Sequence, residues 1–341
     1  MSNHHLTYSV HRNLPCRTWM TATALLFSIV LFSAHATAVE YPTRPITLVL
    51  PATAGGSTDI AGRLIAEGLS KELGQPVVAE NKAGAGGIVA SSYVLDKPAD
   101  GYTLLLAISS KTVMKALQEK PLYDALKDFR TVSLIAQVPT VLVAPASLGV
   151  KNFADLKNYV RDHPGQVMWA IPGIGTAPHL TGYVLTRAMG ADVTEVQYRG
   201  SAPMHIDVIA GRVNVTTDSY ISLQPHIDSG AVVPLAVIGH TRLQQLPNVP
   251  TLTELGYADF SETLFDGWNA IDVRAGTPEP IIQRLNEALG KFIADPAVKQ
   301  RIESMGLVLF DPQTSGEAQK FVEETSAKLE PLARSLNQKG R

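Results

Sequence analysis

The sequence contains almost no cysteine, because Cys16 is the single one among 341 residues. It lies in an N-terminal segment with the pattern of a secretory signal peptide, where Arg12 and Arg17 precede an apolar run over 22–32. Small residues ending at Ala38 form a cleavage motif, so residues 1–38 are predicted to be a signal peptide removed after Ala38. The mature chain would then have no disulfide, thiol nucleophile or thiolate metal ligand.

The alternative for this segment is a membrane anchor. The apolar run is short against the roughly 20 residues that span a bilayer. No later stretch is long and apolar enough to cross a membrane. We therefore expect an exported protein stabilised by its hydrophobic core.

The chain also lacks an excess of positive charge. It has 29 basic and 31 acidic residues, and loss of Arg12 and Arg17 leaves 27 against 31. Nucleic-acid-binding proteins gather Lys and Arg on one face, and no such cluster is present here. We expect no nucleic-acid partner, and any anionic ligand must be held by local dipoles and hydrogen bonds.

Catalytic motifs are missing as well. The sequence has no Gly-x-Ser-x-Gly, no His-Glu-x-x-His and no Walker A motif. Gly84-Ala85-Gly86 lacks the third glycine of a dinucleotide fingerprint, since position 89 is Val. We expect no enzyme activity, no metal and no cofactor. The alternative is an exported hydrolase, because a Ser/His/Asp group can assemble in space without a local motif.

Strand and helix signals alternate along the chain, which favours a mostly parallel α/β sheet. Extended apolar runs over 132–144, interrupted at Pro139, and over 267–273 are candidates for strands that cross between two domains. A mature length of about 300 residues suits two domains. The predicted lobes are residues 39–141 with 267–341, and residues 142–266.

Two segments about 120 residues apart share one construction. Strands over 46–50 and 167–171 each end at a proline, then continue through a small-residue loop into an apolar-periodic helix. Such a unit presents free backbone N–H groups at the carboxyl end of a strand, where anions bind. Two of them suggest two halves of one anion site.

Several separated motifs occur in the order found in one family. They are "PATAGGSTD" (51–59), "GQPVVAENKAGAGG" (74–87), "GIGTAPHL" (173–180), "YRGSAPMHIDVIAG" (198–211) and "PNVPTLTEL" (247–255). Over nearly its whole mature length the chain resembles the extracytoplasmic solute receptors of tripartite tricarboxylate transporters, the Bug-type receptors.

The resemblance implies a two-lobed, periplasmic-binding-protein-like (Venus flytrap) fold. It also implies a periplasmic monomer that closes on a mono-, di- or tricarboxylate or an amino-acid-like ligand, which it passes to integral-membrane permease subunits. A ligand sensor acting on a membrane signalling partner is the alternative that uses the same binding chemistry.

The first loop supplies five candidate ligand-binding residues, which are Gly55, Gly56, Ser57, Thr58 and Asp59. The glycine pair lets backbone approach a ligand closely, and Ser57 is a candidate N-cap. The resemblance places this loop on the ligand carboxylate, and the alternative is a tight turn with a capped helix. For Asp59 the alternative is a helix-end role, because a carboxylate offsets the helix dipole and repels an anion.

The second loop supplies five more candidates, which are Gly173, Ile174, Gly175, Thr176 and His179. Ile171-Pro172 stands where the family usually has small polar residues, which removes side-chain donors. The imidazole of His179 can donate to a ligand, with a packed or capping histidine as the alternative.

Three further candidates follow predicted strands. Ser109 and Asp218 are expected at the cleft, with helix capping as the alternative for Asp218. Arg199 can hold a second carboxylate bidentately, with surface ion pairing as its alternative.

Overall fold

The structure is a computed structural model that describes residues 1–2, 4–9, 40–239, 241–257 and 267–339. Its contacts divide the chain into two units, Met1–Glu40 and Tyr41–Arg341, and the architecture below is that of the second unit. The predicted signal peptide lies almost wholly outside the described residues. None of the described helices combines the length and apolarity needed to span a membrane.

Two sheets organise the second unit. The first contains β1 (Ile46–Leu50), β2 (Val77–Asn81), β3 (Thr103–Ile108), β4 (Phe129–Val138), β10 (Gly267–Arg274) and β11 (Val308–Leu309). The second contains β5 (Thr140–Pro145), β6 (Val167–Ile171), β7 (Val193–Gln197), β8 (Val215–Ser219) and β9 (Val232–Val237). Their spatial orders are β11-β4-β10-β3-β1-β2 and β7-β6-β8-β5-β9.

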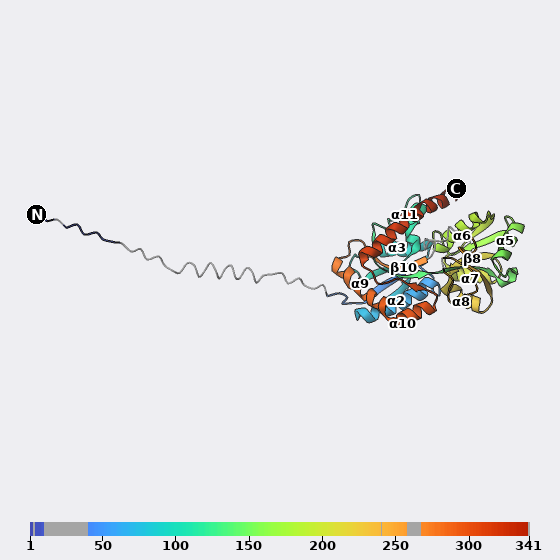
Figure 1. The fold of residues 1–341 in the computed structure, drawn as a ribbon, viewed down its shortest axis with the longest axis horizontal. Coiled ribbons are helices and arrows are strands. Elements are labelled where there is room, and N and C mark those ends of the chain that lie inside the picture. Colours follow the sequence, from blue (N-terminus) through green and yellow to red (C-terminus); the bar gives the residue numbers. More distant parts are fainter. Residues whose placement is uncertain (3, 10–39, 240, 258–266, 340–341) are drawn as a thin grey trace. The chain divides into compact units, whose positions relative to one another are not determined.

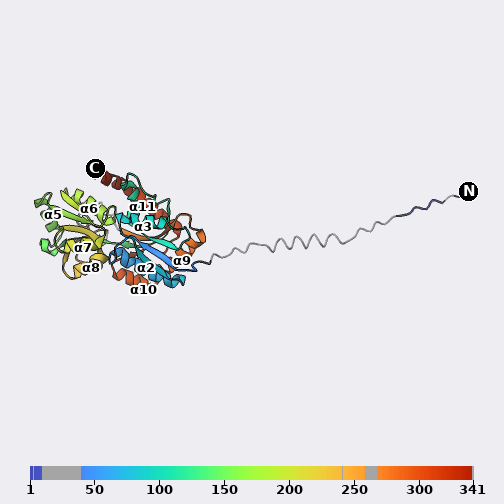
Figure 2. The ribbon, with the colours of Figure 1, turned by 180° about the vertical axis from the view of Figure 1, so that it is seen from behind.

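Helices cover both sheets. They are α2 (Ser57–Leu73), α3 (Ile88–Leu95), α4 (Met114–Leu117), α5 (Phe153–Asp162), α6 (Ala177–Ala188), α7 (Ser201–Ile209), α8 (Tyr220–Asp228), α9 (Glu279–Ala294), α10 (Pro296–Ser304) and α11 (Ser315–Lys339). Short 3₁₀ turns occupy Ala85–Gly87 (η1), Ser109–Thr112 (η2) and Ala146–Leu148 (η3). Figures 1 and 2 show α2, α3, α9 and α10 around the first sheet and α5 to α8 around the second.

Both sheets are mixed, so the expectation of a mostly parallel sheet is wrong. In the first sheet β1 is parallel to β2 and β3, whereas β10 is antiparallel to β3 and β4. In the second, β6 is parallel to β7 and β8, whereas β5 is antiparallel to β8 and β9. The antiparallel pairs involve β4, β5 and β10, the strands next to the two crossings between the sheets, where no helix returns the chain in parallel.

Two crossing strands join the sheets, as the sequence predicts. Only Pro139 separates β4 in the first sheet from β5 in the second. A proline has no backbone N–H to donate to a neighbouring strand, so it interrupts the hydrogen bonding of the sheet at this point. β10 brings the chain back and pairs with β4, where Trp268 lies opposite Gln137. The segment 258–266 that precedes β10 is outside the described residues.

The helices dock through apolar faces. Leu64, Ile65 and Leu69 of α2 are buried, and α2 lies against α9 so closely that a Cβ on Gly68 would meet the Phe292 ring at 2.1 Å. Gly74 ends α2 in the left-handed conformation at φ 69°, with its N–H donating to the Ser70 carbonyl. This packing fixes α2, and with it the loop at its N-terminus.

The C-terminal helix α11 contributes to two hydrophobic clusters. Val322 packs in a cluster with Trp268 of the first sheet. Further along the helix, Leu329 and Ala333 belong to the cluster that contains Trp169 of the second sheet. The helix therefore contacts the cores of both sheets.

Candidate functional site

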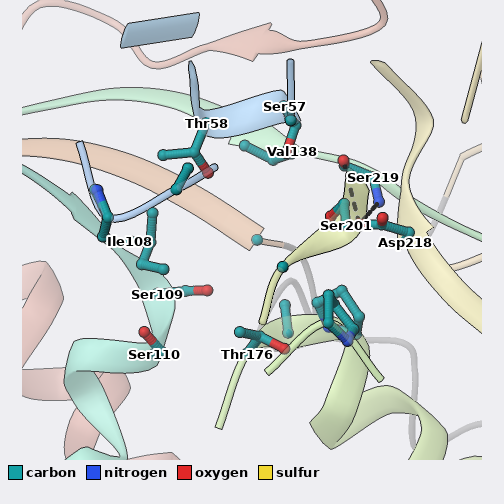
Figure 3. A pocket seen from close by; sticks show the side chains of 18 of the residues that line it. Ser57, Thr58, Ile108, Ser109, Ser110, Val138, Thr176, Ser201, Asp218 and Ser219 are labelled. Atoms are coloured by element: carbon teal, nitrogen blue, oxygen red, sulfur yellow. Dashed lines mark hydrogen bonds between the residues drawn. The ribbon is translucent and has the colours of Figure 1, made fainter. Parts of the chain in front are cut away.

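A cavity of about 110 Å³ lies where the carboxyl ends of β1, β3, β6 and β8 face the crossing strands. About 10–15 Å³ of such space holds one water, so there is room for a small molecule. Figure 3 shows Ser57 and Thr58 on one side, Ser109 and Thr176 on another, and Ser201, Asp218 and Ser219 on a third. Ligands of open α/β sheets bind at this end of the strands.

Four helices begin at this cavity. The N-cap residues of α2, α6, α7 and α8 are Gly56, Thr176, Gly200 and Ser219, and all four line the cavity. None of them makes a side-chain capping hydrogen bond, whereas Asn152 and Asp295 cap α5 and α10. First-turn amides and the positive ends of four helix dipoles therefore converge on one small space, which favours an anion.

The prediction that Ser57 is an N-cap is wrong. The helix starts one residue earlier, with Gly56 extended at φ −78° as the cap and Ser57 as the first helical residue. The Gly56 carbonyl already accepts from the Asp59 and Ile60 amides. The Ser57 side chain lines the cavity instead of closing the helix end.

Asp59 stabilises the first loop through a hydrogen bond to the loop's own backbone. Its Oδ2 accepts the Gly55 amide at 3.0 Å, and its Oδ1 lies 2.9 Å from Arg63 Nη2 and 2.8 Å from Asn81 Nδ2. Burial by itself would raise the pKa of Asp59. The hydrogen bonds from Arg63, Gly55 and Asn81 outweigh that effect, and the pKa lies below its usual value. The carboxylate stays ionised and turned toward its own loop.

His179 holds the second loop in the same way. Its Nδ1 accepts the Gly175 amide at 3.0 Å, and its Nε2 lies 3.6 Å from a Glu195 carboxylate oxygen. Thr176 Oγ1 donates to the Gly173 carbonyl at 2.8 Å. This geometry requires an imidazole that is unprotonated at Nδ1, so His179 supports the loop as an acceptor.

The structure brings six predicted site residues to the cavity. They are Gly56, Ser57, Thr58, Ser109, Thr176 and Asp218. Gly173 and Ile174 line an adjoining chamber of about 310 Å³. Gly55, Asp59, Gly175 and His179 line neither space, because they form the two hydrogen bonds that hold the loops from within. These four residues position the loops, and their contact with a ligand stays a prediction.

Sequence reasoning missed other residues that line the cavity. They are chiefly Ser110, Thr140, Ser201, Ser219 and Asn269. Ser110 Oγ also donates to the Gly86 carbonyl at 2.7 Å, which joins the β3 end to the glycine-rich turn. Ser201 could have been found by the rule used for the other loops, because Gly200-Ser201 follows β7 as Gly56-Ser57 follows β1.

Asp218 reaches the cavity from a buried hydrogen-bonded group. Its Oδ2 lies 2.8 Å from His205 Nε2, and its Oδ1 accepts the Ser219 amide at 2.7 Å. The Ser219 hydroxyl is bonded to Ser222, at 2.8 Å, and not to the imidazole. Among the described residues, this group therefore does not have the serine-to-histidine bond of a hydrolase triad.

Comparisons with known proteins agree on one family. A model described as "Tripartite tricarboxylate transporter family receptor" matches residues 61–338. BugT of Bordetella pertussis is 34% identical over 328 residues, 91% of this chain and 100% of BugT. A UPF0065 protein of Agrobacterium vitis is 36% identical over 305 residues, 89% of this chain and 86% of its own length.

Solved structures show the same two-lobed fold. An R. palustris protein solved with adipate is 33% identical with a TM-score of 0.82, over 86% of this chain and 98% of its own. The periplasmic binding protein BugD has 31% identity and a TM-score of 0.82 over the same shares of the two chains. MatC from Rhodopseudomonas palustris, solved with malate, has 29% identity and a TM-score of 0.80, covering 86% and 100%. This protein belongs to the receptor family of tripartite tricarboxylate transporters.

Proposed function

We propose that this protein binds a small carboxylate between its lobes in the periplasm and delivers it to integral-membrane permease subunits. The observation that carries the proposal is the convergence of four helix N-termini without side-chain caps on one cavity. The described residues lining that cavity include no Lys or Arg. An anion there is held by backbone amides and hydroxyls.

The energetics fit this proposal. Micromolar affinity corresponds to about 8 kcal/mol. Hydrogen bonds to a charged group contribute roughly 1.5–3 kcal/mol each. About four to six such bonds from the helix starts and hydroxyls suffice, even after the costs of association and closure.

The proposal includes how the chain is processed and divided. Residues 1–38 are removed as a signal peptide, and the mature protein acts as a monomer. Residues 39–141 with 267–341 form one lobe and residues 142–266 form the other. The adipate and malate bound to the two R. palustris relatives support the carboxylate class of ligand.

Calorimetry on the ligand-stripped mature protein tests the proposal. We expect at least one member of a panel of mono-, di- and tricarboxylates and acidic amino acids to bind with micromolar or better affinity. Native mass spectrometry of unstripped protein would identify a co-purifying ligand. Failure of the whole panel, together with turnover of ester or amide substrates, would replace the receptor with an exported hydrolase.

A further inference from the structure

The carboxylate cavity opens into a second, larger chamber. This chamber has a volume of about 310 Å³ and shares six lining residues with the first. The shared residues are Pro51, Ala52, Ile108, Pro172, Thr176 and Gly200. A ligand anchored at the four helix starts can therefore extend into the second chamber without leaving the cleft.

Loops from the two sheets meet along this chamber. The glycine-rich turn after β2 forms one wall, and the loop after β6 forms another. A Cβ on Gly86 would lie 2.4 Å from the Ile174 carbonyl oxygen, so the two backbones are in contact at a spacing that only glycine permits. The second chamber is thus bounded by both sides of the cleft, as the first is.

Charge distinguishes the two chambers. The ionisable side chain at the first is Asp218, which is paired with His205. At the second, Tyr198 donates its hydroxyl to Asp207 at 2.7 Å. That leaves Arg199, the only Lys or Arg among the described residues that line either chamber.

Arg199 is exposed and forms no ion pair or hydrogen bond with any residue in the described ranges. Its neighbour Arg212 differs, because it is paired with Asp207. Surface pairing was the alternative role for Arg199 in the sequence, and the described part of the chain offers it no such partner. A guanidinium offers a fork of donors matched to a carboxylate.

We infer that the second chamber receives a second carboxylate and that Arg199 is the residue that selects for it. The inference rests on the proposed function. It assigns the ligand to the dicarboxylates that are long enough to span from the helix starts to Arg199. A monocarboxylate fills the first chamber and leaves the guanidinium in water.

Calorimetry with two matched ligand series tests the inference. The probes are linear dicarboxylates of four to eight carbons and the monocarboxylates of equal length. At least one dicarboxylate should bind wild-type protein about 10-fold or more tightly than its monocarboxylate partner. Arg199→Gln should weaken that dicarboxylate about 10- to 100-fold and change the monocarboxylate by less than about twofold. Arg199→Lys should retain part of the preference.

Arg161→Gln is the matched control, because it removes an exposed arginine of α5 that pairs with Asp162 and lines neither chamber. It should leave both series unchanged, and thermal unfolding of each variant shows that the fold is intact. Equal weakening of both series by Arg199→Gln, or no weakening, overturns the inference while the carboxylate receptor stands. Absence of binding by wild-type protein to either series and to the wider panel counts against the proposed function itself.

Discussion

The two loops that begin α2 and α6 are built on one backbone plan. In each, the amide of a glycine in the left-handed region donates at 3.0 Å to the side chain four residues later. When the two loops are aligned on this shared hydrogen bond, their residues correspond as Gly55 with Gly175, Gly56 with Thr176, Ser57 with Ala177, Thr58 with Pro178, and Asp59 with His179. The two N-caps, Gly56 and Thr176, fall at equivalent positions.

The side chains make the loops unequal. At the second helical position the first loop has Thr58, with an amide and a hydroxyl, whereas the second has Pro178, which has no N–H. At the first helical position the first loop has Ser57 and the second has Ala177, so the second loop lacks this hydroxyl as well. From this comparison we expect the shared backbone plan to set where a ligand carboxylate binds, and the side chains to make the first loop bind it more strongly.

Gly56→Val should have the largest effect. Gly56 is extended, and a Cβ there would meet only the Thr53 carbonyl oxygen, at 3.5 Å. The substitution adds no backbone strain but places branched carbons in the space that the ligand needs. We expect the affinity for the best carboxylate to fall about 100-fold, close to 3 kcal/mol, with little change in the midpoint of thermal unfolding.

Gly290→Ala is the control for this variant. It adds a Cβ on α9, where no atom lies within 4 Å, and should leave binding unchanged. If Gly56→Val lowers stability as much as it lowers affinity, the first loop is only a turn and the comparison fails.

Much of the fold was accessible from the sequence. Strands β1 over 46–50 and β6 over 167–171 match their predicted bounds, and each is followed by a proline. The crossing at Pro139 was visible because a proline interrupts two apolar runs. The antiparallel pairing of β10 was not, since strand direction depends on which partner a strand meets after crossing.

The site was less accessible. Glycine and hydroxyl residues after strands indicated the loops, and Ser57, Thr58 and Thr176 do line the cavity. Sequence could not tell that Asp59 and His179 turn back to bind their own loops, because that depends on loop closure at a spacing of four residues. Asn269 carries no local signal, since it reaches the cavity only through the return of β10.

Asp59→Asn should have the next largest effect, on stability and its pH dependence. The folded pKa of Asp59 is lowered by its hydrogen bonds, so its stabilising contribution is present above the pKa of unfolded aspartate and is lost as pH falls through the folded pKa. Asn should lower the free energy of unfolding at pH 7 by about 1–2 kcal/mol, since the Arg63 partner is partly exposed. Urea unfolding from pH 7 down to pH 3 should show this difference shrinking.

His179→Gln is the matched change in the second loop. It replaces a ring-nitrogen acceptor with an amide-oxygen acceptor, so at pH 7 we expect it to lower the free energy of unfolding less than Asp59→Asn does. A difference between Asp59→Asn and wild type that stays constant over the same pH range would show that charge does not distinguish the two loops.

The smallest effect on affinity is expected from removing one hydroxyl group in each loop. Thr176 already donates its hydroxyl hydrogen to the Gly173 carbonyl, so it has no proton left for a ligand carboxylate. The Thr58 hydroxyl lines the same cavity and makes no hydrogen bond to another described residue, so it can donate to the ligand. Both side chains can be replaced by valine at nearly constant shape.

We expect Thr58→Val to weaken the best carboxylate about 10-fold, the loss of one hydrogen bond to a charged group. Thr176→Val should weaken it by about twofold to fivefold, because only loop order is lost. Calorimetry on the two variants shows which loop contributes more to the affinity for the carboxylate. A larger loss from Thr176→Val would reverse the comparison, because it would show that the second loop, despite Pro178 and Ala177, carries the carboxylate.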